Sequence, residues 1–279
     1  DLHIHPRNLQ YHAAHVVVRY MLFAAVHAVA PHPLLRCLLP PTCSQSKLIH
    51  VVSAGGFADK AEHDAFCSPA MDCVISNVMD QSPNGNHLGQ RHKLVNASRH
   101  IVTVGSTDTP VYGMWFDPGF GMHVDQTKGV ATGNDPESMY AVMSGKHYNG
   151  KCCFDYGNSE TNDRDDGAGA MEAIYFGNAH WRGNTGAGPD GPWAGADLES
   201  GMYYGGGNVT VVNNQSEPLT SEFVSLGLKG RADGFTIMGG DATVGTFTTM
   251  YDGPRPFQPM PNESHSLEQG TMPLQLAPC

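Results

Sequence analysis

The chain has 279 residues, a formal net charge of −11 and only 15% charged residues. Nucleic acids and anionic membrane surfaces repel a chain of this charge, so both are excluded as partners. The length is enough to bury one large core or two small ones, and the composition suits a protein that acts on neutral polymers outside the cell.

The first 47 residues give the least regular pattern. The segment 13–30 is largely apolar, but His15, Arg19 and His27 interrupt it and no basic start precedes it. It therefore fits neither a secretory signal nor a membrane helix well. Residues 32–46 match no pattern.

Short strands follow along the rest of the chain. Thirty-three glycines and 19 prolines separate short runs of Val, Ile, Thr, Tyr and Phe, which favours an all-β sandwich over a helical or βαβ protein. In chain order, the runs between turn residues predict strands at Leu48–Val52, Cys73–Val78, His100–Val104, Met139–Met143, Met171–Tyr175, Asn208–Val212, Phe223–Leu228, Phe235–Met238 and Thr246–Tyr251.

Two of the seven cysteines, Cys152 and Cys153, are adjacent. An ordinary disulfide needs Cα atoms about 4.4–6.8 Å apart, whereas neighbours are about 3.8 Å apart. The pair alone leaves two interpretations open. It forms a strained ring, of the kind found at binding surfaces, or it is two separate thiols.

Asp197 and Glu199 are the best carboxylate pair for chemistry on a sugar. On a strand, residues two apart lie on one face, and Trp181 and Trp193 are near enough in sequence to stack on a sugar ring. The alternative is an exposed strand with two solvated acids. No cysteine and histidine spacing resembles a zinc site, and no metal is expected.

From Gly129 the sequence runs GVATGNDPESMYAVMSGKHYNGKCCFDYGNSETNDRDDGAGAMEAIYFGN. This run resembles the catalytic domain of the fungal and bacterial α-L-arabinofuranosidases of glycoside hydrolase family 54. The segments GGFADKAEHDAFC, DQSPNGNHL, GAGPDGPWAGADLES and FVSLGLKGRADGF resemble the same family. The similarity extends over roughly residues 52–260.

The resemblance implies a concanavalin-like β-sandwich of the jelly-roll type, as a single domain. Residues 48–279 would form it, after a poorly matching segment 1–47 with a short helix. The implied enzyme is a retaining α-L-arabinofuranosidase that releases terminal arabinofuranose from arabinan or arabinoxylan side chains. It would need no cofactor, act as a monomer and bind arabinose-containing plant polysaccharides.

The resemblance also assigns residue roles. Glu199 matches the family's nucleophile, and Asp197 matches an acid that contacts the substrate. Cys152 and Cys153 match a vicinal disulfide that lines the arabinose subsite, and Trp181 matches a stacking tryptophan. Ser200 and Gly201 depart from the family, which has asparagines there, so part of the sugar contact would be altered.

A second disulfide, Cys67–Cys73, also follows from the resemblance. Disulfides indicate an oxidising compartment, and a secreted, extracellular glycoprotein is therefore expected. Sequons compatible with secretion begin at Asn96, Asn208, Asn214 and Asn262.

The acid/base is the one catalytic residue of the family that has no clear match in this chain. Retaining glycosidases need a second carboxyl group about 5–5.5 Å from the nucleophile, and the family takes it from a Gly-Gly-Asp motif. Asp241 ends such a triplet, but its flanks match the family segment that precedes the acid/base strand. Residues 266–279 fall where that strand belongs, with Cys279 in the place of the aspartate. We therefore expect the acid/base to be missing, with Asp241 as a less favoured substitute. The alternative function is a catalytically degenerate arabinose-binding domain.

Overall fold

The computed structural model describes about half of the residues of the chain. These are residues 26–31, 44–50, 52, 58–67, 73–80, 83–90, 95–97, 101–104, 109–117, 121–124, 126–131, 135–148, 154–158, 172–179, 191–198, 201–205, 213, 216–254 and 274–276.

Eleven strands form one large sheet, in which every pairing is antiparallel. In spatial order, ten of them are β13 (Gly201–Tyr203), β12 (Trp193–Leu198), β11 (Glu172–Gly177), β10 (Phe154–Asn158), β17 (Leu274–Leu276), β8 (Gly121–His123), β4 (Leu88–Gln90), β3 (Val74–Val78), β1 (Val26–Pro31) and β2 (Ser44–Ile49). The eleventh strand, β5 (Val95–Asn96), pairs with β3.

Two smaller sheets and one helix complete the described elements. The four-stranded sheet has the antiparallel order β16 (Thr248–Gly253), β15 (Gly234–Asp241), β14 (Phe223–Arg231) and β9 (Glu137–Ser144). The two-stranded sheet consists of β6 (Ile101–Val104) and β7 (Thr109–Tyr112), and the helix is α1 (Lys60–Phe66).

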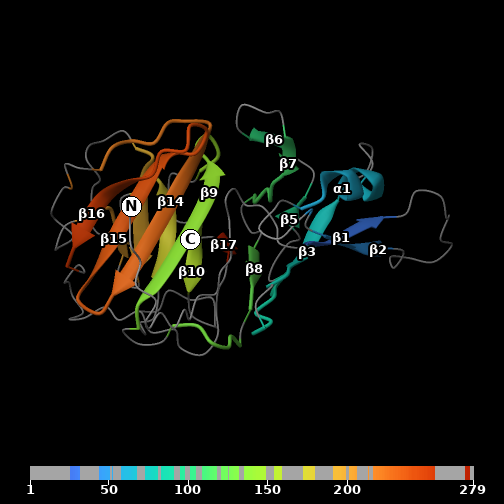
Figure 1. Ribbon diagram of the computed structural model, residues 1–279, viewed down its shortest axis with the longest axis horizontal. Coiled ribbons are helices and arrows are strands. Elements are labelled where there is room, and N and C mark those ends of the chain that lie inside the picture. The colour runs from blue at the N-terminus through green and yellow to red at the C-terminus, as the bar shows by residue number, and fades with distance from the viewer. Residues whose placement is uncertain are drawn as a thin grey trace, which may run out of the picture.

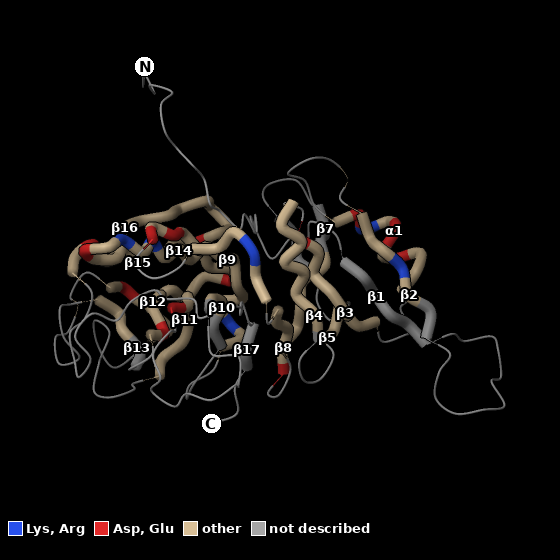
Figure 2. Tube along the Cα trace, turned by 90° about the horizontal axis from the view of Figure 1, so that it is seen from below, with Lys and Arg blue, Asp and Glu red and all other residues tan. Residues whose placement is uncertain are grey.

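The four-stranded sheet packs on the β10–β13 half of the large sheet, and the two layers are seen edge-on in Figure 2. Alternating residues of β14 point into the space between the layers, where they join one hydrophobic core with residues of β11 and β12. The core side chains from these three strands are Val224, Leu226, Leu228, Ile174, Phe176, Ala194, Ala196 and Leu198. This architecture confirms the prediction of an all-β sandwich.

The other half of the large sheet, from β4 to β2, lies to one side of the sandwich together with β6, β7 and α1 (Figure 1). Strands β8 and β17 lie between the two halves in both views. Asp59 caps α1 by accepting a hydrogen bond from the Glu62 amide at 3.0 Å. A disulfide bond joins Cys67, at the end of α1, to Cys73, which directly precedes β3.

Most predicted strands are confirmed within a few residues, although several bounds shift. The strand predicted at Leu48–Val52 is β2, Ser44–Ile49, so the predicted division after residue 47 falls inside a strand; the domain boundary itself stays a prediction. The strand at Asn208–Val212 and the helix expected near residue 13 lie outside the described residues. Within the described part of the chain, no helix has the length and apolar character needed to cross a membrane.

Candidate functional site

Asp197 lies near the end of β12, a strand with one face toward the sandwich core and the other on the far side of the large sheet. Ala194, Ala196 and Leu198 point into the sandwich core. The alternate residues, which include Trp193 and Asp197, point to the opposite face of the large sheet. Asp197 is only 5% exposed. A carboxylate held at this depth can accept hydrogen bonds from the hydroxyl groups of a bound sugar.

A cluster of buried aromatic side chains shares this face with Asp197. Tyr175 of β11, Trp193 of β12 and Tyr204, which follows β13, are each 0% exposed. The Tyr204 hydroxyl donates a 2.5 Å hydrogen bond to the carbonyl oxygen of Ala179, and the Tyr175 hydroxyl accepts one of 3.0 Å from the Ala179 amide. Burial, and then the neighbouring Tyr175, raises the pKa of Tyr204 far above its usual range, so its phenol stays protonated.

Glu199, the predicted nucleophile, lies outside the described residues, between Leu198 of β12 and Gly201 of β13. Those two residues are directly paired across the two strands. Cys152, Cys153, Trp181 and Cys279 also lie outside the described residues, so their predicted roles stay predictions.

The register of the described strands shows which of their ends lie together. The paired residues Asp155, Tyr175 and Gly195 form one row across β10, β11 and β12. The paired residues Asn158, Glu172 and Leu198 form a row three residues further on, about 10 Å along the strands. Phe154, where β10 begins, therefore lies at the opposite end of the strands from Leu198, where β12 ends.

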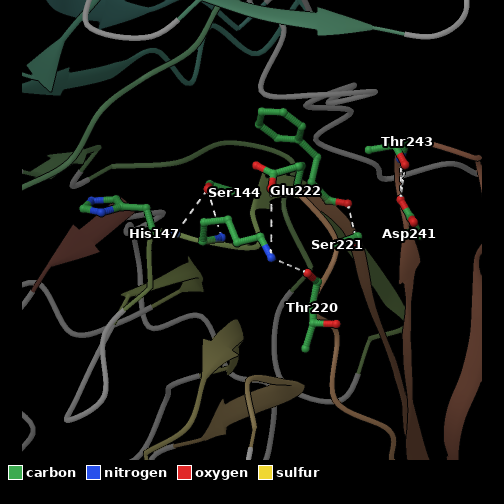
Figure 3. Close-up of polar contacts among 9 residues, drawn as sticks. Ser144, His147, Thr220, Ser221, Glu222, Asp241 and Thr243 are labelled. Atoms are coloured by element: carbon green, nitrogen blue, oxygen red, sulfur yellow. Dashed lines mark hydrogen bonds and ion pairs between the residues drawn. The ribbon is translucent and has the colours of Figure 1, made fainter.

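Asp241 ends β15 in the four-stranded sheet, at the start of the turn that leads to β16. Its carboxylate accepts hydrogen bonds from the Thr243 amide at 2.7 Å and from the Thr243 hydroxyl at 2.5 Å. Figure 3 shows this pair at the turn, apart from Ser144 and His147. These hydrogen bonds, led by the Thr243 hydroxyl, lower the pKa of Asp241 below its usual value. The residue is therefore a turn carboxylate that stays ionised.

The segment after β9 precedes the cysteine pair in the chain. It is held by contacts with other segments that the sequence did not indicate. The Ser144 hydroxyl accepts hydrogen bonds of 3.1 Å from the amides of Lys146 and His147. The Lys146 ammonium donates to the carbonyl oxygen of Thr220 at 2.6 Å, and the His147 ring stacks on Trp115 with 3.7 Å between ring centroids. These contacts join the turn after β9 to the segment before β14 and to Trp115, which follows β7.

Sequence reasoning missed Tyr175 and Tyr204. The signal that could have found Tyr175 is the period of two within AIYFG, which places this tyrosine on the opposite face from Ile174. Among the described residues, no group of three or more His, Cys, Asp or Glu side chains could hold a metal ion.

Comparison with known proteins places these features in a family. Residues 13–271 match the family model described as the catalytic part of α-L-arabinofuranosidase B. The α-L-arabinofuranosidase B of Aspergillus niger is 40% identical over 232 residues, which cover 77% of this chain and 45% of that protein. The α-L-arabinofuranosidase of Hypocrea jecorina is 41% identical over 228 residues, which cover 75% and 44%. The chain thus spans less than half the length of these curated relatives.

Solved structures give the same result. A variant of a family 54 α-L-arabinofuranosidase soaked with 4-nitrophenyl α-L-arabinofuranoside superposes with a TM-score of 0.75 at 34% identity, covering 90% of this chain and 55% of that one. An arabinofuranosidase complexed with arabinofuranosyl-α-1,2-xylobiose superposes with a TM-score of 0.74 at 33% identity, covering 90% and 54%.

Proposed function

The chain belongs to the catalytic family of α-L-arabinofuranosidase B, glycoside hydrolase family 54, and on this basis we propose that it is a retaining α-L-arabinofuranosidase. The observation that carries the proposal is the match of the catalytic family model to residues 13–271, a range that includes Asp197 and Glu199. The burial of Asp197 on the face of β12 opposite the sandwich core supports it, because a sugar-binding carboxylate must point away from the core.

In this mechanism Glu199 attacks the anomeric carbon and the bond to the leaving oxygen breaks, giving a covalent arabinosyl-enzyme. Water then attacks the same carbon, the bond from that carbon to the Glu199 oxygen breaks, and the water loses a proton to solvent, which releases arabinose with retained configuration. Asp197, two residues earlier on β12, accepts hydrogen bonds from the sugar hydroxyl groups and holds the ring in place for the attack.

We propose further that Asp241 is not the acid/base of this reaction. A general acid must be protonated at rest, which requires a raised pKa, whereas the hydrogen bonds from Thr243 lower the pKa of Asp241. General acid catalysis is typically worth about 10²–10⁴-fold. If residues 1–279 supply no other acid, substrates with good leaving groups will be hydrolysed far better than polysaccharides.

The proposed substrates are arabinofuranosyl side chains of arabinan and arabinoxylan. A related structure in the family holds arabinofuranosyl-α-1,2-xylobiose, an arabinofuranose carried on a short xylan chain. The net charge of −11 suits neutral polysaccharides of this kind. The disulfide bond between Cys67 and Cys73 is consistent with our proposal that the protein is secreted.

The test is hydrolysis of 4-nitrophenyl α-L-arabinofuranoside by the chain and by its Glu199→Gln variant. We expect hydrolysis by the parent and a loss of at least a thousandfold in the variant. Glu222→Gln is the matched control, because the Glu222 side chain is 72% exposed and lies beside the turn after β9. Equal rates in the parent and the Glu199→Gln variant would refute the assignment of the nucleophile.

The second candidate function is arabinose binding without turnover. The ionised state of Asp241 favours this second function, because an ionised carboxylate in the Gly-Gly-Asp motif has no proton to donate to the leaving group. Calorimetric titration of the folded parent with arabino-oligosaccharides, followed by analysis of the products, separates the two functions. Binding with no released arabinose supports the binding domain, and released arabinose excludes it.

A further inference from the structure

Gly195 leaves a space on the Asp197 face of β12, and the ring of Tyr204 fills it. A Cβ atom added at Gly195 would lie 2.9 Å from Cδ1 and 3.0 Å from Cε1 of Tyr204. Gly195 lies midway between Trp193 and Asp197 on the same face of the strand. The Tyr204 ring therefore lies against β12 at Gly195, two residues from Asp197 on the same face of the strand.

The Tyr204 ring is held from several directions. Its centroid lies 5.2 Å from that of Trp193 and 6.1 Å from that of Tyr175, both in edge-to-face geometry. Its hydroxyl is bonded to the carbonyl oxygen of Ala179, beyond the end of β11. The side chain thus starts after β13, crosses β12 and ends beyond β11, so it links three neighbouring strands on the Asp197 face.

We propose that Tyr204 is a positioning residue for Asp197: its ring fills the space over Gly195 and so keeps the Asp197 carboxylate in one orientation toward the sugar. This inference rests on the proposed function, because it concerns the same arabinose site. Tyr204 and Asp197 are 0% and 5% exposed, so neither side chain has solvent into which it could relax. Tyr204 itself is 0% exposed, so in this proposal it acts through Asp197 rather than on the sugar.

The ring, rather than the hydroxyl, is the part that acts on Asp197. The hydroxyl is engaged with Ala179, and the atoms that lie against β12 are ring carbons. Tyr204→Phe therefore keeps the positioning contact and loses only the bond to Ala179, whereas Tyr204→Leu loses the ring. The charge of Asp197 is also among the causes that raise the pKa of Tyr204, which agrees with their closeness.

Tyr203 supplies a matched control one residue away. It is also 0% exposed, but it belongs to the core cluster between the two sheets and pairs with Ala196. Tyr203→Leu and Tyr204→Leu remove the same atoms from equally buried positions on opposite faces of the sheet. Both will lower the melting temperature, so a merely structural role for Tyr204 predicts the same behaviour for both.

The experiment measures the dissociation constant of 4-nitrophenyl α-L-arabinofuranoside by calorimetry, with the full chain carrying Glu199→Gln so that the ligand survives. We expect Tyr204→Leu to weaken binding at least tenfold, and Tyr204→Phe and Tyr203→Leu to stay within twofold of the parent. Equal affinities for Tyr204→Leu and Tyr203→Leu would overturn the inference. No binding by the parent would instead count against the proposed function.

A second readout needs no ligand. With ¹³C-labelled aspartate, the Asp197 carboxyl signal can be assigned by its disappearance in Asp197→Asn. We expect this signal to shift in Tyr204→Leu and to stay in place in Tyr203→Leu; an unmoved signal in both would refute the positioning role. The methyl group added in Gly195→Ala would lie too close to the same ring, so this variant should shift the Asp197 signal as well. It replaces Tyr204→Leu in the experiment if that variant does not fold.

Discussion

Asp197 and Asp241 are both aspartates near strand ends, and their surroundings give them different chemistry. Asp197 is buried beside aromatic rings, whereas Asp241 lies in a turn and accepts two hydrogen bonds from Thr243. A residue of the first kind can serve a buried sugar site. A residue of the second kind stabilises a turn.

We expect Asp241→Asn to leave hydrolysis of 4-nitrophenyl α-L-arabinofuranoside within twofold of the parent. The amide oxygen can accept the same hydrogen bonds from Thr243, so the free energy of unfolding should change little. The check is kcat/KM for both proteins. A drop of a hundredfold or more would restore Asp241 as the acid.

Asp197→Asn should behave in the opposite way. A hydrogen bond that involves a charged group is worth about 1.5–3 kcal/mol, so loss of the charge should lower kcat/KM by roughly tenfold to a hundredfold. Initial rates at low substrate concentration measure this ratio. Unchanged kcat/KM would mean that Asp197 makes no polar contact with the sugar.

Part of the site was predictable from single residues and part was not. The spacing of Asp197 and Glu199 predicts one shared strand face, because side chains alternate along a strand. Tyr204 escapes this reasoning, because its ring reaches the face across Gly195 from a neighbouring strand. No local pattern encodes a contact that depends on the register of two strands.

At the scale of elements, α1 is fixed to β2 by an ionic contact. The Glu62 carboxylate accepts a hydrogen bond from the His50 amide at 2.9 Å and lies 3.2 Å from the Lys47 ammonium. The His50 amide is the largest cause that lowers the pKa of Glu62, to about 2. The ionised form is therefore the one that stabilises the fold, and its contribution is lost as the pH falls from 4.5 toward 2.

His63, on the same helix, is 1% exposed and stacks on the Tyr112 ring of β7 with 3.9 Å between centroids. Burial lowers its pKa from 6.5 to about 4. The neutral ring stabilises the fold above pH 6.5, and this contribution, about 3 kcal/mol at most, is lost as the pH falls from 6.5 through 4.

We therefore expect acid to unfold the α1 region first. Urea midpoints at pH 7, 5 and 3 should fall over both intervals in the parent, through His63 between pH 7 and 5 and through both groups between pH 5 and 3. His63→Phe removes the group that titrates between pH 6.5 and 4, so its midpoint should fall less than the parent's, above all between pH 7 and 5. Parallel curves for the parent and the variant would contradict the role of His63.

The elements differ in how well their sequences encode them. Strands β9 and β14 bury roughly every second residue over several positions, and the prediction located both. All six residues of β12 are buried, so WAGADL has no alternation to detect. The helix α1 has only seven residues, too few for a helical period to stand out, and its stability comes from the Asp59 cap and tertiary contacts.

At the scale of the whole molecule, β17 joins the two halves of the large sheet. Gln275 pairs with Asp155 of β10 on one side and with Gly121 of β8 on the other. This three-residue strand is therefore central in the sheet, although it lies far from both partners in sequence. The backbone pairing of β17 with β10 and β8 holds the two halves of the large sheet together, and no local sequence pattern predicts it.

We expect Gln275→Pro to lower the free energy of unfolding by about 3 kcal/mol or more, because proline lacks the amide that a central strand needs. Gln275→Ala keeps the amide and should change stability by less than about 1 kcal/mol. Urea unfolding of both variants is the measurement. A proline variant as stable as the alanine variant would show that β17 does not pair on both sides.

The position of β17 also sets the order in which the protein can be completed during its synthesis. Strands β8 and β10 leave the ribosome more than a hundred residues before Leu274–Leu276 do. Until then each has an edge without the neighbour that will cover it, and such edges invite pairing with other chains. The nascent protein thus depends on its last described strand to close its largest sheet, and any factor that shields those two edges during translation would raise the yield of folded protein.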